Sequence, residues 1–174
     1  MNKNRINRFL VASWVAVLLV LEVSCTSKPV KQEESLVSEM PPLSAAPAAD
    51  ENTLGDSDSG KAMGIRTVNF AYDSSKLDED SKTVLKTNAD ILKKHERLHV
   101  QVEGHCDQRG GVQYNIALGE RRAKAVRNYL KDLGVSDSRL TVISFGKERL
   151  VDESTTEEAY AKNRRANFAI TSHE

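Results

Sequence analysis

Hydrophobic side chains recur at two different spacings along this chain, and each spacing predicts one kind of element. In residues 67–72, Val68, Phe70 and Tyr72 occupy every second position, which is typical of a strand with one buried face. Residues 77–94 instead carry apolar residues every three or four positions, which is typical of a helix. The two spacings alternate toward the C-terminus. We expect strands at 67–72, 98–103, 140–145 and 165–171, and helices at 77–94, 113–133 and 157–163.

Strands that alternate with helices predict a sheet with helices packed against it. The chain is 39% hydrophobic and only 5% aromatic, so it can bury a small core but not a large one. This composition therefore supports a single helical layer. We predict an α/β fold, a two-layer sandwich with a mixed sheet of about four strands and the helices packed on one face.

The N-terminus has the charge and hydropathy pattern of an export signal. Lys3, Arg5 and Arg8 precede an apolar run over residues 9–21. That run is shorter than the ~20 residues that a helix needs to span a bilayer, which favours a cleaved signal over a permanent anchor. We expect residues 1–24 to be a signal peptide.

A cysteine follows this signal directly, after the small residue Ser24. The arrangement resembles a bacterial lipoprotein cleavage site, and we expect Cys25 to carry the lipid. Glu22 stands where such sites usually have an aliphatic residue. Ordinary signal cleavage and an uncleaved anchor therefore stay open as alternatives.

Residues 25–65 are expected to form the lipidated cysteine and a disordered linker. All four prolines of the chain lie there among Ser, Ala, Glu and Asp, and no apolar period is sustained. Residues 66–174 are left as the globular unit. A lipid at one end of such a linker and a folded unit at the other would join a membrane to a structure at a variable distance.

The overall charge narrows the possible partners. The chain has 25 basic and 25 acidic residues and a formal net charge of zero. Nucleic-acid binders are normally clearly basic, so we expect no nucleic-acid partner.

One position breaks the amphipathic pattern of the helix expected at 113–133. On a wheel with about 3.6 residues per turn, Arg122 falls inside the apolar sector, one turn after Leu118 and one turn before Val126. A guanidinium that faces a core is costly unless an acid or a bound anion pairs with it. The spacing leaves open a structural ion pair, a stem that packs while the head reaches solvent, and a ligand-binding cation.

Two acidic residues come close to the ends of predicted strands. Asp73 follows the strand at 67–72, and Asp107 follows the strand at 98–103. If these strands are parallel neighbours, their carboxyl ends share the rim of the sheet where α/β proteins commonly bind ligands. Two carboxylates, the Arg122 guanidinium and a helix N-terminus would then converge on a pocket that suits an ammonium and a carboxylate together. A simple turn role remains the alternative for Asp73.

Four blocks of the sequence resemble the OmpA-like peptidoglycan-binding domain, and the resemblance extends over residues 66–174. The blocks are Gly104-His105-Cys106-Asp107-Gln108-Arg109-Gly110, then Tyr114-Asn115 with Leu118-Gly119-Glu120-Arg121-Arg122-Ala123, the opening Asn69-Phe70-Ala71-Tyr72-Asp73, and the closing Asn163-Arg164-Arg165-Ala166.

This resemblance implies non-covalent binding of peptidoglycan through the diaminopimelate of its stem peptide. By motif position, Asp107 would hold the ammonium and Arg122 the carboxylate. The family pattern usually has Thr or Ala where this chain has Cys106, which is a small change. Further residues implied by the resemblance are Asp73, Asn115 and Leu118, which would line the pocket, and Arg165, which would support it.

The resemblance also implies a non-catalytic tether, anchored by lipid in the outer membrane, facing the periplasm, and using neither a cofactor nor a metal. Thr26, rather than Asp, follows Cys25, which in the sorting pattern of such lipoproteins indicates the outer membrane. The lipid-anchored members imply a periplasmic partner, TolB of the Tol system. Flagellar stator proteins and porins carry this domain too. We expect neither an upstream barrel nor a spanning helix here, so a lipoprotein fits better.

Two other interpretations use His105 and Cys106. A hydrolase could use a Cys-His pair with Asp107, but adjacent residues at a strand end point to opposite faces. A metal site could use His95, His99, His105 and Cys106, although His95 and His99 straddle a predicted helix end. If Cys25 carries lipid, Cys106 has no disulfide partner, and we expect it to be a small, partly buried residue beside the site.

Overall fold

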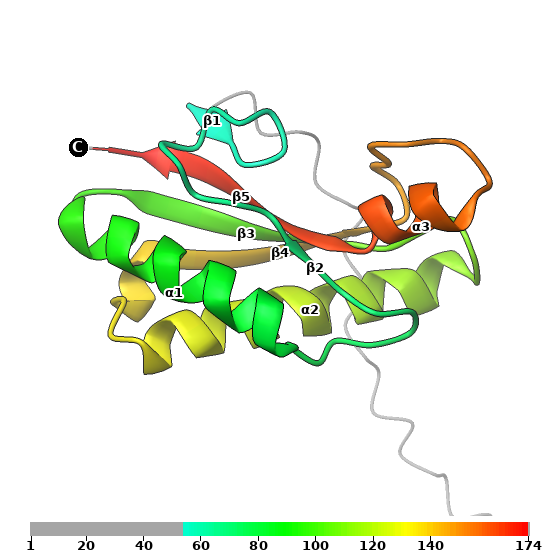
Figure 1. The fold of residues 1–174 in the computed structure, drawn as a ribbon, viewed down its shortest axis with the longest axis horizontal. Coiled ribbons are helices and arrows are strands. Elements are labelled where there is room, and N and C mark those ends of the chain that lie inside the picture. The colour runs from blue at the N-terminus through cyan, green and yellow to red at the C-terminus, as the bar shows by residue number, and fades with distance from the viewer. Residues whose placement is uncertain (1–53, 174) are drawn as a thin grey trace, which may run out of the picture. The chain divides into compact units, whose positions relative to one another are not determined.

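The computed structural model describes residues 54–173 (Figure 1). The expected signal peptide, Cys25 and most of the expected linker lie outside the described residues. Within residues 54–173, no helix has the length and apolar content that crossing a bilayer requires. The elements, in chain order, are β1 (Gly55–Asp56), β2 (Val68–Asn69), α1 (Glu79–Lys94), β3 (His99–His105), α2 (Val112–Asp132), the 3-10 helix η1 (Asp137–Arg139), β4 (Leu140–Gly146), α3 (Glu157–Asn163) and β5 (Arg165–Ser172).

The sheet is mixed, because β3 runs parallel to β4 and antiparallel to β5. The strand order is β1-β5-β3-β4, and β2 also pairs with β5. Helix α2 makes the crossover that two parallel strands require. Helices α1 and α2 lie on one face of the sheet (Figure 1). The predicted two-layer α/β sandwich is therefore confirmed, with five strands in place of about four.

The folded unit begins before residue 66, which corrects the expected end of the linker. Strand β1 pairs with β5, with Gly55 opposite Ile170. Ala62 and Ile65 are buried in the core. A strand of two residues is too short to show a period in the sequence, so only its pairing with β5 identifies it.

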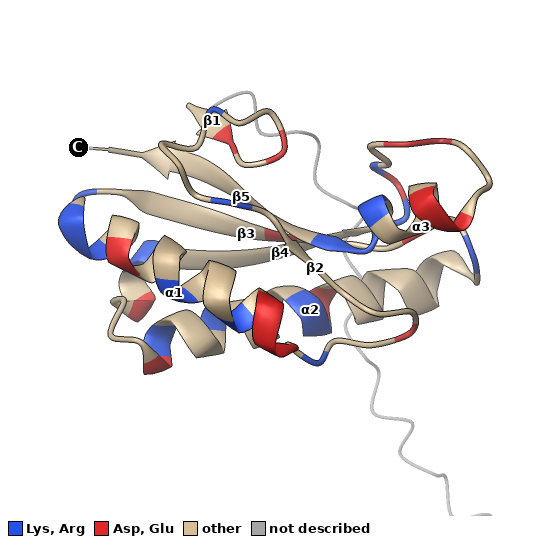
Figure 2. Cartoon of the chain, viewed as in Figure 1, with Lys and Arg blue, Asp and Glu red and all other residues tan. Residues whose placement is uncertain are grey.

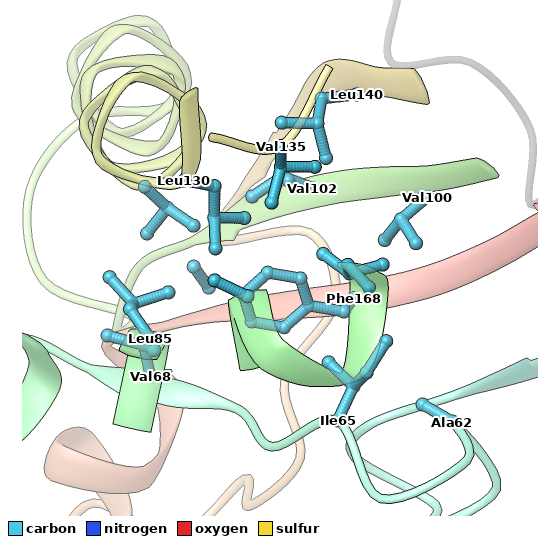
Figure 3. Close-up of a cluster of buried hydrophobic side chains, with 14 of the residues drawn as sticks. Ala62, Ile65, Val68, Leu85, Val100, Val102, Leu130, Val135, Leu140 and Phe168 are labelled. Atoms are coloured by element: carbon cyan, nitrogen blue, oxygen red, sulfur yellow. The ribbon is translucent and has the colours of Figure 1, made fainter. Parts of the chain in front are cut away.

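The core lies between the two helices and the sheet. Figure 3 shows Phe168 of β5 at the centre of a cluster that includes Val68, Leu85, Val102 and Leu130. These side chains come from five different elements, so the core joins both helices to strands β2, β3 and β5.

The first expected strand, 67–72, is reduced to Val68–Asn69. Phe70 still donates its backbone N–H to the carbonyl of Arg164, at 2.8 Å. Beyond it the chain leaves the sheet, and the carbonyls of Ala71 and Ser74 accept hydrogen bonds from the side chain of Arg122 instead. The alternating pattern is confirmed for Val68 and Phe70, which are buried, but it is wrong for Tyr72, which is exposed where strand pairing has already stopped.

Two glycines let α2 approach β3 at backbone contact distance. A Cβ added to Gly104 would lie 1.9 Å from the carbonyl oxygen of Gly119, and one added to Gly119 would lie 2.3 Å from Oγ of Ser144. Any other residue at either position would push the helix away from the strand. This close contact between α2 and β3 allows Arg122, one turn further along α2, to reach the end of β3 at His105.

Candidate ligand-binding site

A small cavity of about 60 Å³ lies where β3 ends and α2 begins. Five of the six predicted ligand-binding residues line it. The full lining is Tyr72, Asp73, Cys106, Asp107, Arg109, Gly110, Tyr114, Asn115, Leu118, Arg122 and Arg164.

The two acidic residues meet there for a reason that differs from the expected one. Strands β2 and β3 are not neighbours, because β5 lies between them and pairs with both. Each is antiparallel to β5, so the two run in the same direction. Their carboxyl ends therefore still reach the same rim, and Asp73 and Asp107 line one cavity.

The side chain of Arg122 is 1% exposed, so the helix wheel placed it correctly. Its Nε donates to the carbonyl of Ser74 at 2.8 Å, Nη2 to that of Ala71 at 3.1 Å, and Nη1 to that of His105 at 2.8 Å. Nη1 also lies 3.4 Å from Sγ of Cys106. The guanidinium thus joins α2 to the segment after β2 and to the end of β3.

The charge of Arg122 is not neutralised by these contacts. Among the described residues no carboxylate lies within 4.0 Å of its guanidinium, so the structural ion pair that the sequence left open is not formed there. Burial of the guanidinium has the largest effect on the pKa of Arg122 and lowers it below its ordinary value. A buried cation held only by neutral carbonyls favours an anion at its open side.

Asp107 is buried and surrounded by two arginines. Nη2 of Arg109 lies 2.6 Å from its Oδ2, Nε of Arg109 lies 3.2 Å from Oδ1, and Nη1 of Arg164 lies 3.4 Å from Oδ2. Burial alone would raise the pKa of Asp107, but the hydrogen bonds from Arg109 outweigh it and hold the pKa below its ordinary value. Asp107 is therefore an anion at neutral pH.

Asp73 is exposed and has a backbone φ of 49°, in the left-handed region. Asp is among the few residues other than Gly that tolerate this conformation. Its carboxylate accepts a hydrogen bond from the hydroxyl of Tyr114, and this contact raises the pKa of Tyr114. Asp73 has a conformational role in its turn and also presents a carboxylate at the mouth of the cavity.

Asn115 and Cys106 line the cavity and are joined to each other and to the turn before α2 by hydrogen bonds. Nδ2 of Asn115 donates to the carbonyl of Arg109 at 2.7 Å, which holds the turn before α2. The thiol of Cys106 donates to the carbonyl of Asn115 at 3.3 Å. Burial raises the pKa of this thiol, so it stays protonated at neutral pH.

Arg165 is not among the residues that line the cavity over residues 54–173, and its supporting role stays a prediction. Its Nε lies 2.7 Å from Oδ2 of Asp58. Arg164, one position earlier, lines the cavity instead. Both arginines are buried, but Arg164 lies at the end of α3 and Arg165 begins β5, so their side chains reach different partners.

Sequence reasoning also assigned no role to three residues that line the cavity, Arg109, Tyr72 and Tyr114. All three lie in the sequence blocks quoted above. Their signal was a cation and two aromatic side chains close in sequence to the candidate acids. The ion pairs of Arg109, its contact with the Tyr72 ring and the hydrogen bond from Tyr114 to Asp73 form only in the folded chain.

The geometry disfavours the two alternatives based on His105. The His105 ring stacks on Phe145 at a centroid distance of 5.5 Å, while the Cys106 thiol faces Asn115 and Arg122. Because the pKa of the thiol is raised, it is a poor nucleophile. Within residues 54–173, no three His, Cys, Asp or Glu side chains form a group that could hold a metal, and the four candidate ligands are no exception.

A larger hollow of about 550 Å³ lies at the opposite end of β3. Figure 2 shows Lys and Arg positions gathered around the loop between α1 and β3 there. Its lining includes Lys93, Lys94 and Arg97, but only one acid, Glu96. We place the site in the smaller cavity because, unlike the larger hollow, it is lined by two carboxylates and a buried guanidinium. That combination can hold a ligand carrying both an ammonium and a carboxylate.

Comparison with known proteins finds one matching family and several similar chains. Residues 69–164 match the model of the OmpA family. The chain is 45% identical over 112 residues to a peptidoglycan-associated lipoprotein of Pseudomonas aeruginosa, covering 64% of this chain and 66% of that protein. It is 37% identical over 156 residues to one of Pseudomonas putida, covering 88% and 92%. The crystal structure of the peptidoglycan-associated lipoprotein from Burkholderia pseudomallei superimposes with a TM-score of 0.59 at 39% identity, covering 60% of this chain and 89% of that one.

Proposed function

This chain belongs to the OmpA family, among the peptidoglycan-associated lipoproteins, and on that premise we propose that it binds peptidoglycan non-covalently and tethers the outer membrane to the cell wall. The ligand is the free end of diaminopimelate in the stem peptide. That end carries one ammonium and one carboxylate on the same carbon, which is the pair of charges that the cavity suits.

One observation carries the proposal: Arg122 is a fully buried cation with only neutral partners, and it lines a cavity shared with two carboxylates. A guanidinium has five N–H donors. The contacts to Ser74, Ala71, His105 and Cys106 use four of them. The fifth donor and the uncompensated charge are available to a ligand carboxylate.

The roles of the remaining residues follow from their places. Asp107 receives the ligand ammonium at the buried end of the cavity, and Asp73 adds negative charge at the mouth. Asn115 holds the turn that carries Asp107 and Arg109, and Leu118 supplies an apolar wall for the ligand chain.

The N-terminal region supplies the membrane end of the tether. Lipid on Cys25 anchors the chain in the outer membrane. Because the folded unit begins near Leu54, 28 residues separate it from Cys25, and these reach at most on the order of 100 Å when fully extended. By relation to the lipoproteins above, we also propose a partner in the Tol-Pal system, TolB. This partner is tested by expressing the full chain in the bacterium it comes from and asking whether TolB co-purifies with it from the cell envelope.

Sedimentation with purified peptidoglycan sacculi tests the binding proposal. Asp107→Asn removes the negative charge but keeps the shape of the side chain. We expect at least about a tenfold loss of protein in the pellet, since a charge-assisted contact of this kind contributes about 1.5–3 kcal/mol. Asp137→Asn is the matched control, because Asp137 is also paired with two basic side chains, Arg127 and Lys131, but lies on η1 at the far end of α2. Undiminished pelleting of Asp107→Asn would reject the site.

A further inference from the structure

We propose that Arg109 occupies the ammonium position on Asp107 when no ligand is bound, and that a ligand binds by displacing this internal cation. The inference rests on the proposed function and deepens it. It makes Arg109 a residue that sets both affinity and ligand selectivity.

Arg109 already makes the contact that a ligand ammonium would make. It reaches both carboxylate oxygens of Asp107, through Nε at 3.2 Å and Nη2 at 2.6 Å. Its guanidinium carbon lies 4.2 Å from the ring centroid of Tyr72 and 4.3 Å from that of Tyr160. The bond to Asp107 raises the pKa of Arg109 above its ordinary value, so the cation is permanent.

Asp107 has no free acceptor position for a second cation. Oδ1 accepts from the backbone N–H of Arg109 and from its Nε, while Oδ2 accepts from Nη2 of Arg109 and from Arg164. A carboxylate offers about four lone-pair positions. A ligand ammonium must therefore replace one of these donors.

The size of the cavity leads to the same conclusion. About 60 Å³ is well below the ~150 Å³ that accommodates benzene, which has six non-hydrogen atoms. The charged end of diaminopimelate has five: one carbon, the ammonium nitrogen and the three atoms of the carboxylate. The cavity must enlarge before it can admit that group.

Arg109 is the lining cation best able to move. Its side chain is 34% exposed, whereas that of Arg164 is 9% exposed and that of Arg122 is buried. Arg164 is also held by the carbonyl of Phe70 and by Glu157, so it stays in place.

Glu157 gives the displaced guanidinium a second partner. Nη1 of Arg109 lies 3.3 Å from its Oε2, and this carboxylate side chain is 61% exposed in the first turn of α3, a helix on which Figure 2 shows acidic positions. Rotation of the Arg109 guanidinium from Asp107 toward Glu157 keeps the charge paired and frees Asp107. A ligand without an ammonium cannot replace Arg109, so the exchange selects for the free amino group of the diamino acid.

Titration calorimetry of the full chain with free diaminopimelate tests the inference. Arg109→Gln removes the competing cation and should bind diaminopimelate about three- to thirtyfold more tightly than the wild type, the range expected for a partly exposed charged pair. Arg121→Gln is the matched control: it removes an exposed cation near Tyr114 that makes no contact with Asp107, and it should bind like the wild type. A thermal melt of each variant confirms that it is folded.

A second measurement uses only the wild type. Nitrogen-15 NMR of the arginine side chains should show the Nε–H signal of Arg109 shifting on addition of diaminopimelate. Equal or weaker binding by Arg109→Gln, or an unshifted Arg109 signal in a protein that does bind, overturns this inference alone. If the wild type and the variant both fail to bind diaminopimelate, the proposed function and this inference fall together.

Discussion

Nη1 of Arg122 donates to the carbonyl oxygen of His105 at 2.8 Å, so the middle of α2 is hydrogen-bonded to the last residue of β3. The same guanidinium holds the segment that carries Asp73, through the carbonyl of Ser74. Arg122 therefore builds the cavity as well as lining it. A binding role and a structural role coincide in one side chain.

Arg122→Ala should consequently lose stability as well as binding. Three carbonyls would lose their donor, the buried one of His105 and the partly buried ones of Ala71 and Ser74, and we expect the free energy of unfolding to fall by about 3 kcal/mol. Urea denaturation measures it. Arg122→Lys keeps the positive charge but loses the planar guanidinium with its several donors. Its free energy of unfolding should lie between those of the wild type and Arg122→Ala. If Arg122→Ala unfolds at the same urea concentration as the wild type, the hydrogen bonds from Arg122 to the three carbonyls do not stabilise the fold.

Gly119→Ala should destabilise the chain, because its new Cβ would lie 2.3 Å from Oγ of Ser144 and 2.8 Å from the carbonyl oxygen of Gly104. We expect a loss of about 1–3 kcal/mol, as for other overpacked sites. Thermal unfolding measures it. Gly111→Ala is the control: Gly111 has a φ of −77° and no atom within 4 Å of an added Cβ, so its cost should stay below about 1 kcal/mol. Equal effects of the two substitutions would argue against the close approach.

Acid should weaken the fold through His105. Burial is the main influence on its ring and lowers the pKa of His105 from its ordinary value of 6.5. Its two ring nitrogens make no hydrogen bond among residues 54–173, and although Oε2 of Glu103, 3.6 Å from Nε2, favours the charged ring, burial outweighs this effect on the pKa of His105. The unfolded chain therefore binds a proton more readily, so this contribution to stability is complete above pH 6.5 and is lost as the pH falls toward the folded pKa.

Urea denaturation between pH 7.5 and 5.5 measures this dependence. His105→Gln should flatten the fall in stability over that range. His99→Gln, at an exposed position of the same strand, should leave it unchanged. A slope that persists in His105→Gln would assign the effect to other groups.

Processing of the N-terminus has a spectroscopic signature. Trp14 is the only tryptophan of the chain, and it lies in the expected signal peptide. Protein purified from the membrane fraction should therefore show tyrosine but no tryptophan fluorescence, and its mass should correspond to a chain that begins with an acylated Cys25. Tryptophan emission from the membrane-bound protein would mean that the signal is retained, the alternative that Glu22 leaves open.

The sequence alone was sufficient for most elements and for the burial of Arg122. Helix and strand periods are local properties: they repeat within a few residues and are visible without a partner. The position of Arg122 relative to Leu118 and Val126 follows from the helical turn alone. The sequence blocks also indicated that Asp73 and Asp107 lie at the candidate site, and both line the cavity.

Only the tertiary structure decided the features that depend on distant partners. Strand β1 exists because β5 offers it an edge, and two residues without a period give no local signal. The pairing of β5 likewise decided that Arg164 rather than Arg165 faces the cavity. Asp107 and Arg109 are only two residues apart, yet their ion pair depends on a turn held by Asn115 of the following helix. Periodicity describes which face of an element is apolar, whereas pairing and charge contacts are fixed only when the elements meet.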